Sequence, residues 1–294
     1  MHHSTTFLRR SGFIILLIWL AMGLSACGTM HTMGVTEDQP GTSSEQLENM
    51  ADSQRERGEY RMAHVLYEQA LAKRPDDPAL VYKKGLVSLE SDRKEDALKD
   101  FNKAVAMNPK FSLAYEGMGQ AYFYMEDMEK ARVAFQKAVD IDPGLWKTWV
   151  FLGMVHDRSR QYDAAITAYR LAIELRPRDG ALYNNLGVSL THNQEYDAAL
   201  TAFKKAIDLN YSEKRVYNNM GIALGLAGRH DAALEAFRKS GREAQAFNNL
   251  GVVYLNQKKY THAIQSFEKA IELEPSFYVT AGENLKKAKV AMQQ

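Results

Sequence analysis

Paired asparagines recur in the second half of this chain. A side-chain amide carries both a hydrogen-bond donor and an acceptor, so a row of amides can bond to the backbone of an extended peptide without reading its side chains. The same amides can instead bond only to one another, between neighbouring structural units. The sequence leaves both interpretations open, and the first predicts a central track of Asn185, Asn219 and Asn249. The pairs are Asn184-Asn185, Asn218-Asn219 and Asn248-Asn249, and Asn49 occupies the same column near the start.

No catalytic or metal-binding motif accompanies these amides. The sequence contains no phosphate-binding glycine loop, no His-Glu-x-x-His pair and no nucleophile elbow. His156-Asp157 and His230-Asp231 are adjacent pairs without a third ligand at metal spacing. Lysine and arginine number 37 against 36 aspartates and glutamates, with no basic stripe between aromatic residues. We therefore expect neither an enzyme nor a bound metal or cofactor, and no nucleic-acid partner.

A fixed interval of 34 residues indicates the elements that carry the amides, because Ala97 follows Ala63 by that distance and the neighbouring residue types repeat with it. Self-similarity at this period is typical of stacked helical units. In one unit, Ala199, Phe203 and Ala206 fall at three- and four-residue spacings, which predicts one apolar face of a helix. The alanine column is Ala63, Ala97, Ala131, Ala165, Ala199, Ala233 and Ala263; a glycine column runs Gly85, Gly119, Gly153, Gly187, Gly221 and Gly251; and an aromatic column runs Tyr67, Phe101, Phe135, Tyr169, Phe203, Phe237 and Phe267.

These columns resemble a tetratricopeptide repeat (TPR) array over residues 44–277. The resemblance implies an all-α fold, a right-handed α-solenoid of seven TPR helix pairs plus a C-terminal capping helix over residues 278–294. It also implies a concave groove lined by the first helix of each pair, where a protein or extended peptide binds. In the earlier repeats we expect Tyr82, Phe123, Tyr124 and Lys147 in this groove. Trp146 fits an interface and a packing position equally well.

The sixth repeat is shorter than the others, because Ala263 follows Ala233 by only 30 residues. Four residues make about one helical turn, so the deletion shortens the second helix and nearly keeps the phase of the next repeat. We expect a local kink there and a left-handed cap at Gly241.

The start of the chain predicts its location. Arg9 and Arg10 precede an apolar run over residues 13–24, which ends in Leu-Ser-Ala-Cys-Gly at residues 24–28. This resembles a bacterial lipobox, which implies a signal peptide over 1–26 and lipidation of Cys27, followed by a flexible tether up to residue 43. An ordinary signal peptide with an incidental cysteine, or an uncleaved anchor, is the alternative. Because Gly28 stands where inner-membrane lipoproteins carry Asp, the resemblance implies the outer membrane, facing the periplasm.

Residues 215–234 and 243–251 are similar to the TPR lipoproteins of tight-adherence (Flp) pilus assembly, the TadD type. This similarity implies an outer-membrane-anchored adaptor that binds protein partners in the periplasm, with a secretin as one candidate. A scaffold for cell-wall hydrolases is the alternative. Both interpretations attach the chain to the membrane only through its N-terminal lipid.

Overall fold

The structure is a computed structural model that describes residues 41–275 and 278–293. The expected signal peptide, Cys27 and nearly all of the tether lie outside the described residues. From Thr42 onward the chain forms one compact unit. None of the helices in the described ranges is long and apolar enough to cross a membrane.

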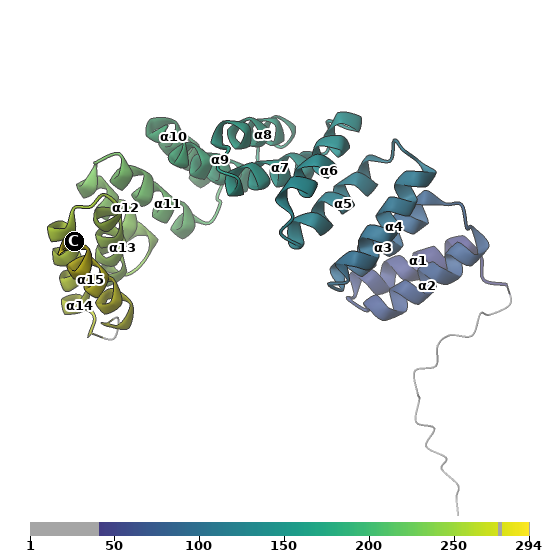
Figure 1. Cartoon of the computed structure of the whole chain (residues 1–294), viewed down its shortest axis with the longest axis horizontal. Coiled ribbons are helices and arrows are strands. Elements are labelled where there is room, and N and C mark those ends of the chain that lie inside the picture. Colours follow the sequence, from purple (N-terminus) through teal and green to yellow (C-terminus); the bar gives the residue numbers. More distant parts are fainter. Residues whose placement is uncertain (1–40, 276–277, 294) are drawn as a thin grey trace, which may run out of the picture. The chain divides into compact units, whose positions relative to one another are not determined.

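The described residues form fifteen helices and no strand, which confirms the all-α prediction. Each repeat contributes a first and a second helix (Figure 1). The first helices are α1 (Ser44–Glu56), α3 (Pro78–Glu90), α5 (Ser112–Tyr124), α7 (Trp146–Arg158), α9 (Gly180–His192), α11 (Glu213–Leu226) and α13 (Glu243–Asn256). The second helices are α2 (Tyr60–Lys73), α4 (Lys94–Met107), α6 (Met128–Ile141), α8 (Tyr162–Leu175), α10 (Tyr196–Asp208), α12 (His230–Ser240) and α14 (Tyr260–Leu273), and α15 (Tyr278–Met292) follows the last pair.

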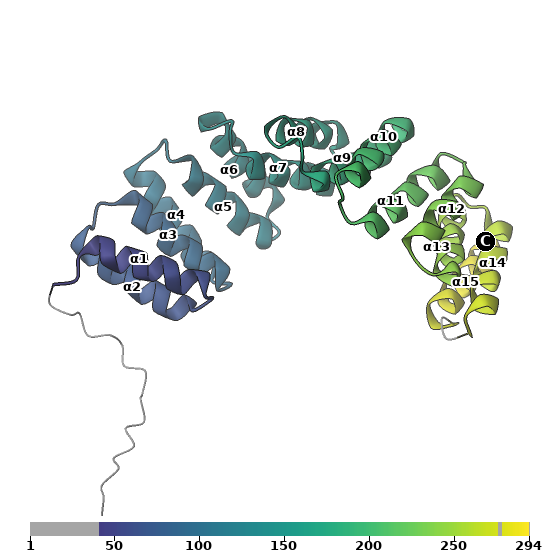
Figure 2. The same cartoon turned by 180° about the vertical axis from the view of Figure 1, so that it is seen from behind.

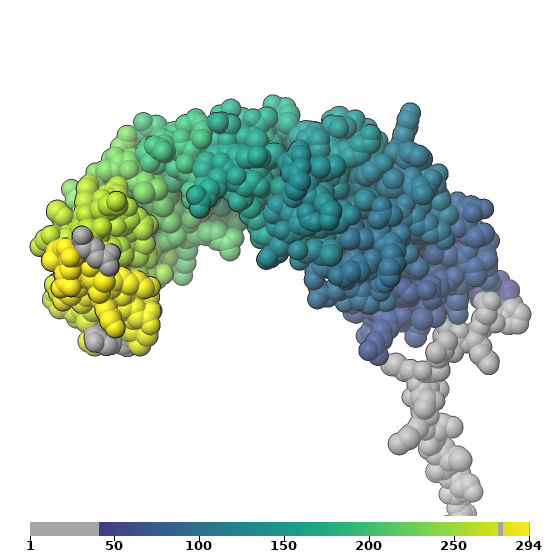
Figure 3. Space-filling view, in the orientation of Figure 1, coloured from purple at the N-terminus to yellow at the C-terminus, as the bar shows by residue number. Residues whose placement is uncertain are grey.

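The helix pairs pack in succession. Each second helix contacts its own first helix and the first helix of the next repeat. First helices also contact one another directly, α3 with α5, α9 with α11 and α11 with α13. Both cartoon views show this order, and in the space-filling view the sequence colours follow one another along the unit without mixing (Figures 2 and 3). Each repeat is therefore supported by its immediate neighbours, as in other repeat proteins.

The glycine and aromatic columns meet inside each pair. A Cβ added at Gly187 would lie 2.5 Å from Cε1 of Phe203, and a Cβ at Gly251 would lie 2.5 Å from Cε1 of Phe267. The rings themselves are fully buried. The absence of a side chain at the glycine thus lets the first helix rest on the ring of the second, which confirms that these columns serve packing.

The deletion in the sixth repeat shortens α12 to 11 residues, against 13 or 14 in the other second helices. The expected left-handed cap at Gly241 is wrong, because its φ of −173° and ψ of −153° are extended. Only Gly241 and Arg242 separate α12 from α13. A left-handed residue would turn the chain back over α12, whereas this short link runs straight into the next helix.

Candidate peptide-binding face

The first helices together form the surface that we call the first-helix face. The paired asparagines join its repeats to one another. Asn219 Nδ2 donates to Asn184 Oδ1 at 2.9 Å, and Asn249 Nδ2 donates to Asn218 Oδ1 at 2.9 Å. Asn284 Nδ2 in α15 donates to Asn248 Oδ1 at 3.0 Å. The second amide of each pair thus bonds back to the first amide of the preceding pair.

Burial separates the amides into two groups. Asn184 and Asn248 are only 5% and 6% exposed, whereas Asn185, Asn218, Asn219 and Asn249 are partly exposed. Asn219 and Asn249 use one N–H each in the bonds between repeats, so their carbonyl oxygens and second N–H groups stay available. In this arrangement Asn184 and Asn248 support the row, and the surface available to a peptide belongs to the other four residues.

Asn185 differs from the other amides of the row. The acceptor of Asn219 lies 35 residues earlier, at Asn184. The residue 35 positions before Asn185 is Val150, whose side chain cannot accept a hydrogen bond. The Asn185 side chain accordingly makes no hydrogen bond within the described ranges. Its whole amide is therefore available to a ligand.

Aliphatic side chains accompany the amides. Val188, Ile222 and Val252 each follow one of the amides Asn185, Asn219 and Asn249 by three residues, which places them on the same helix face about one turn later. Ile222 is 38% exposed. Aspartate, glutamate, lysine and arginine are absent from α9 and are confined to the first turns of α11 and α13. This part of the first-helix face is therefore neutral, with amides beside apolar groups.

The groove residues expected in the earlier repeats fall into two groups. Tyr82 packs against the rings of Phe101 and Phe111, and burial raises its pKa to about 12, so the phenol stays neutral. Phe123 is 6% exposed. Tyr124 is 51% exposed, and Lys147 is exposed with its ammonium 5.7 Å from the centre of the Trp146 ring. Tyr124 and Lys147 thus reach the surface, while Tyr82 and Phe123 chiefly pack.

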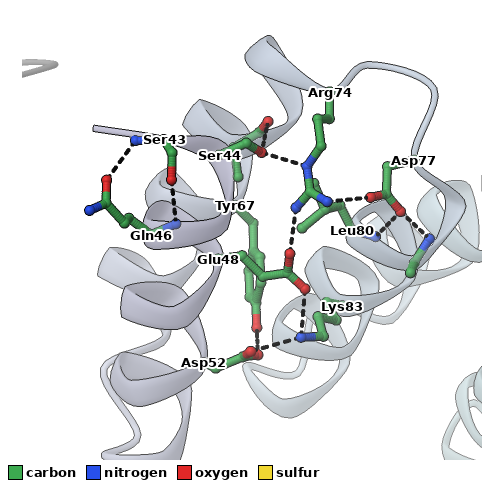
Figure 4. Close-up of polar contacts among 12 residues, drawn as sticks. Ser43, Ser44, Gln46, Glu48, Asp52, Tyr67, Arg74, Asp77, Leu80 and Lys83 are labelled. Atoms are coloured by element: carbon green, nitrogen blue, oxygen red, sulfur yellow. Dashed lines mark hydrogen bonds and ion pairs between the residues drawn. The ribbon is translucent and has the colours of Figure 1, made fainter. Parts of the chain in front are cut away.

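Charged groups replace the amides in the first two repeats. Lys83 Nζ donates to Glu48 Oε1 at 2.8 Å and to Asp52 Oδ2 at 2.7 Å, so it ties α3 to α1 as Asn219 ties α11 to α9 (Figure 4). The Tyr67 hydroxyl donates to the same Asp52. Asn49 is exposed on α1. This end of the face is therefore polar and already occupied by its own ion pairs.

A buried carboxylate ties the fourth repeat to the fifth. Ser189 Oγ donates to Asp157 Oδ1 at 2.7 Å, and Tyr169 OH donates to Asp157 Oδ2 at 3.0 Å. Burial raises the pKa of Asp157, and the two hydroxyl donors oppose that rise. Asp157 is thus engaged within the stack, and within the described ranges no group of three or more His, Cys, Asp or Glu side chains could hold a metal ion.

Sequence signals did not identify two features of this face. Asn284 follows Asn249 by 35 residues, close to the repeat period, and that spacing could have placed it in the row. The burial of Asn184 and Asn248 depends on the lateral offset between neighbouring first helices, and a single repeat carries no signal for that offset.

Comparisons with known proteins agree with this architecture. A family model described as the cilia and flagella-associated protein 70 C-terminal domain matches residues 18–246, and the tetratricopeptide repeat model matches residues 244–277. The heat-shock protein cognate co-chaperone sgt12 of Aspergillus fumigatus is 32% identical over 95 residues, which make up 32% of this chain and 28% of that protein. The TPR repeat-containing thioredoxin TTL4 of Arabidopsis thaliana is 26% identical over 91 residues, 31% of this chain and 13% of that protein. The chain thus spans under a third of the curated relatives it matches.

Solved structures show the same fold. A tetratricopeptide repeat protein from Parabacteroides merdae superposes with a TM-score of 0.58 at 19% identity, covering 85% of this chain and 100% of that one. The MamA protein superposes with a TM-score of 0.51 at 25% identity, covering 57% of this chain and 92% of that one. The first family model covers most of the chain and the second its last repeat, so this chain belongs to the tetratricopeptide repeat family, in the group represented by the C-terminal TPR domain of cilia and flagella-associated protein 70.

Proposed function

We propose that this TPR scaffold is an outer-membrane lipoprotein that binds an extended, uncharged segment of a periplasmic protein along Asn185, Asn219 and Asn249. The observation that carries the proposal is the row of partly exposed amides on a neutral helix face. Binding of protein partners is the general activity of TPR scaffolds. The anchor, the compartment and the class of segment are the specific parts of the proposal.

The spacing of the row suits an extended chain. Packed helices lie about 8–10 Å apart, and an extended chain advances about 3.3 Å per residue, so neighbouring amides meet a peptide about every third residue. Each backbone hydrogen bond contributes about 0.5–1.5 kcal/mol. Val188, Ile222 and Val252 can take up apolar side chains between these bonds. The segment is therefore recognised by its backbone and its lack of charge.

The test is calorimetric titration with the periplasmic domain of a pilus secretin encoded beside this chain. Asn185→Ala is the cleanest variant, because Asn185 makes no bond between repeats. We expect it to weaken binding by about 0.5–1.5 kcal/mol, and the triple variant with Asn219→Ala and Asn249→Ala to weaken it at least about tenfold. Asn284→Ala is the matched control, since it removes the same kind of inter-repeat bond beyond the proposed track. Equal affinities for the wild type and the triple variant contradict the peptide track.

The membrane anchor rests on the lipobox around Cys27. One acyl chain holds a protein only marginally, whereas several hold it stably, because each buried methylene contributes about 0.8 kcal/mol. We expect Cys27→Ser to release the protein from the outer membrane in sedimentation and flotation of cell fractions. A variant that still partitions wholly with the outer membrane contradicts lipid anchoring at this cysteine.

The assembly in which the adaptor works follows from its similarity to TadD-type lipoproteins. We expect a deletion strain to lose tight-adherence pili and to mislocalise the pilus secretin, as seen by electron microscopy and by fractionation. A strain that keeps its pili but digests its cell wall abnormally contradicts the pilus role and favours the scaffold for cell-wall hydrolases.

A further inference from the structure

A surface pocket lies where the fourth, fifth and sixth repeats begin, apart from the amide row. Its volume is about 720 Å³. Trp146 at the start of α7, the turn Leu175–Arg178 before α9, and Tyr211 before α11 contribute to its lining. Leu175 is 42% exposed, and Arg176 and Arg178 are both exposed. The pocket thus combines aromatic and apolar surface with two guanidinium groups.

The first repeat shows what usually happens to the arginine of this turn. Arg74 occupies the position three repeats before Arg176. Its Nε donates to Ser44 Oγ at 2.8 Å, its Nη2 to Glu48 Oε2 at 2.5 Å, and its Nη1 pairs with Asp77 Oδ2 at 3.1 Å (Figure 4). All three edges of this guanidinium are satisfied within the protein.

The corresponding partners of Arg176 have changed. Trp146 stands in the place of Ser44, and Val150 in the place of Glu48. Asp179 stands in the place of Asp77, and its carboxylate accepts the backbone N–H of Ala181 at 3.0 Å. Neither Arg176 nor Arg178 forms an ion pair with any residue that the structure describes. The Arg176 guanidinium instead lies 5.3 Å from the centre of the Trp146 ring.

Two further cations border the pocket. Lys147 Nζ lies 5.7 Å from the centre of the Trp146 ring, and Arg215 Nη1 donates to the Tyr211 hydroxyl at 3.1 Å. Asp179 is the one carboxylate among the lining residues, which are all in the described ranges. The pocket and its border therefore carry four cationic side chains against one acid, in a chain that is nearly neutral as a whole.

We propose that this pocket binds an acidic segment of a protein partner, in which a carboxylate side chain stands next to an aromatic or large apolar one. Paired hydrogen bonds from a guanidinium match the geometry of a carboxylate. Tryptophan, tyrosine and arginine are also the side chains that most often anchor protein interfaces. The carboxylate meets Arg176 and Arg178, and the apolar neighbour covers Trp146 and Leu175. This apolar surface favours a peptide over a free phosphate, which would leave it exposed.

Fluorescence anisotropy with the full chain tests the proposal. The probe is a fluorescein-labelled peptide of alternating glutamate and phenylalanine, compared with peptides in which glutamine replaces glutamate or glycine replaces phenylalanine. We expect saturable binding of the first peptide and at least tenfold weaker binding of the other two. We also expect Arg176→Gln combined with Arg178→Gln to weaken the first peptide at least tenfold without a change in melting temperature, since both side chains are exposed.

The control removes two charges elsewhere. Arg61→Gln combined with Arg170→Gln changes two exposed arginines that form no ion pair within the described residues and lie outside this pocket. We expect this double variant to bind the acidic peptide as the wild type does. Equal binding of the glutamate and glutamine peptides overturns the proposal. An equal loss in both double variants overturns it too, and so does displacement of the peptide by inorganic phosphate at the peptide's own affinity, which indicates a phosphate site. The amide-row variants leave this binding unchanged, so the two proposals fail separately.

Discussion

At the scale of single residues, a glycine opposite an aromatic ring sets how closely the two helices of a repeat approach. In the fifth repeat a Cβ at Gly187 would meet Phe203 Cε1 at 2.5 Å, well inside van der Waals contact. The ring is fully buried and cannot move away. A β-branched side chain at this glycine must therefore push α9 off α10.

We expect Gly187→Val to lower the free energy of unfolding by about 1–3 kcal/mol, the usual cost of overpacking a core. Phe203→Leu shortens the opposing side chain, so the double variant should recover part of the loss. Urea unfolding of the four proteins in a double-mutant cycle measures the coupling between the two positions. Strictly additive losses would show that the two side chains do not compete for the same space.

The sequence predicted the residue columns well but not the bonding state of individual side chains. The asparagine column was visible because its members repeat, and the structure adds that Asn219 and Asn249 spend one N–H each on the preceding repeat. Arg176 gave no signal, because its difference from Arg74 lies in Trp146 and Val150, which replace Ser44 and Glu48 thirty and twenty-six residues before the arginine. Contacts between repeats are needed to see that an arginine has lost its acids.

At the scale of elements, the turn between the two helices of each repeat has a backbone feature that residue types conceal. One residue in every turn has a left-handed backbone with φ between 58° and 79°, at the same repeat interval. These residues are Gly58, Asp92, Glu126, Arg160, Gln194, Gly228 and Lys258. Only two are glycine, so the column shares a conformation and no chemistry. The sequence could not reveal it, and it placed its left-handed residue at Gly241 instead.

This turn gives opposite expectations for two substitutions. A left-handed backbone costs an ordinary residue about 1–2 kcal/mol and glycine almost nothing, while glycine loses about 0.5–1 kcal/mol more backbone entropy on folding. We therefore expect Glu126→Gly to raise the free energy of unfolding by about 0.5–1 kcal/mol and Gly228→Ala to lower it by about 1 kcal/mol. Urea unfolding midpoints measure both. Shifts in the same direction for the two variants contradict the conformational explanation.

At the scale of the whole array, the helix pairs support only their neighbours. The period of 34 residues and the count of seven pairs were therefore predictable, because every repeat satisfies the same local rules. What one repeat's residues cannot encode is how far a disturbance at one end travels. The contacts answer this, since α15 touches α14 and α13 and lies far along the chain from α1.

The capping helix provides the test. Ala288 in α15 is fully buried against Ala263 and Phe267, so a glutamate there puts an unpaired charge into an apolar contact. We expect Ala288→Glu to detach α15 and to expose the faces of α13 and α14, since terminal repeats need a polar-faced cap. Hydrogen exchange should then accelerate in α13 and α14 and stay unchanged in α1–α8. Lys287→Glu, at the exposed neighbouring position, should leave exchange unchanged everywhere. Because stability in such an array is a sum of repeat and nearest-neighbour contributions, an equal loss of protection from α1 to α14 would mean that the array unfolds as one cooperative unit instead.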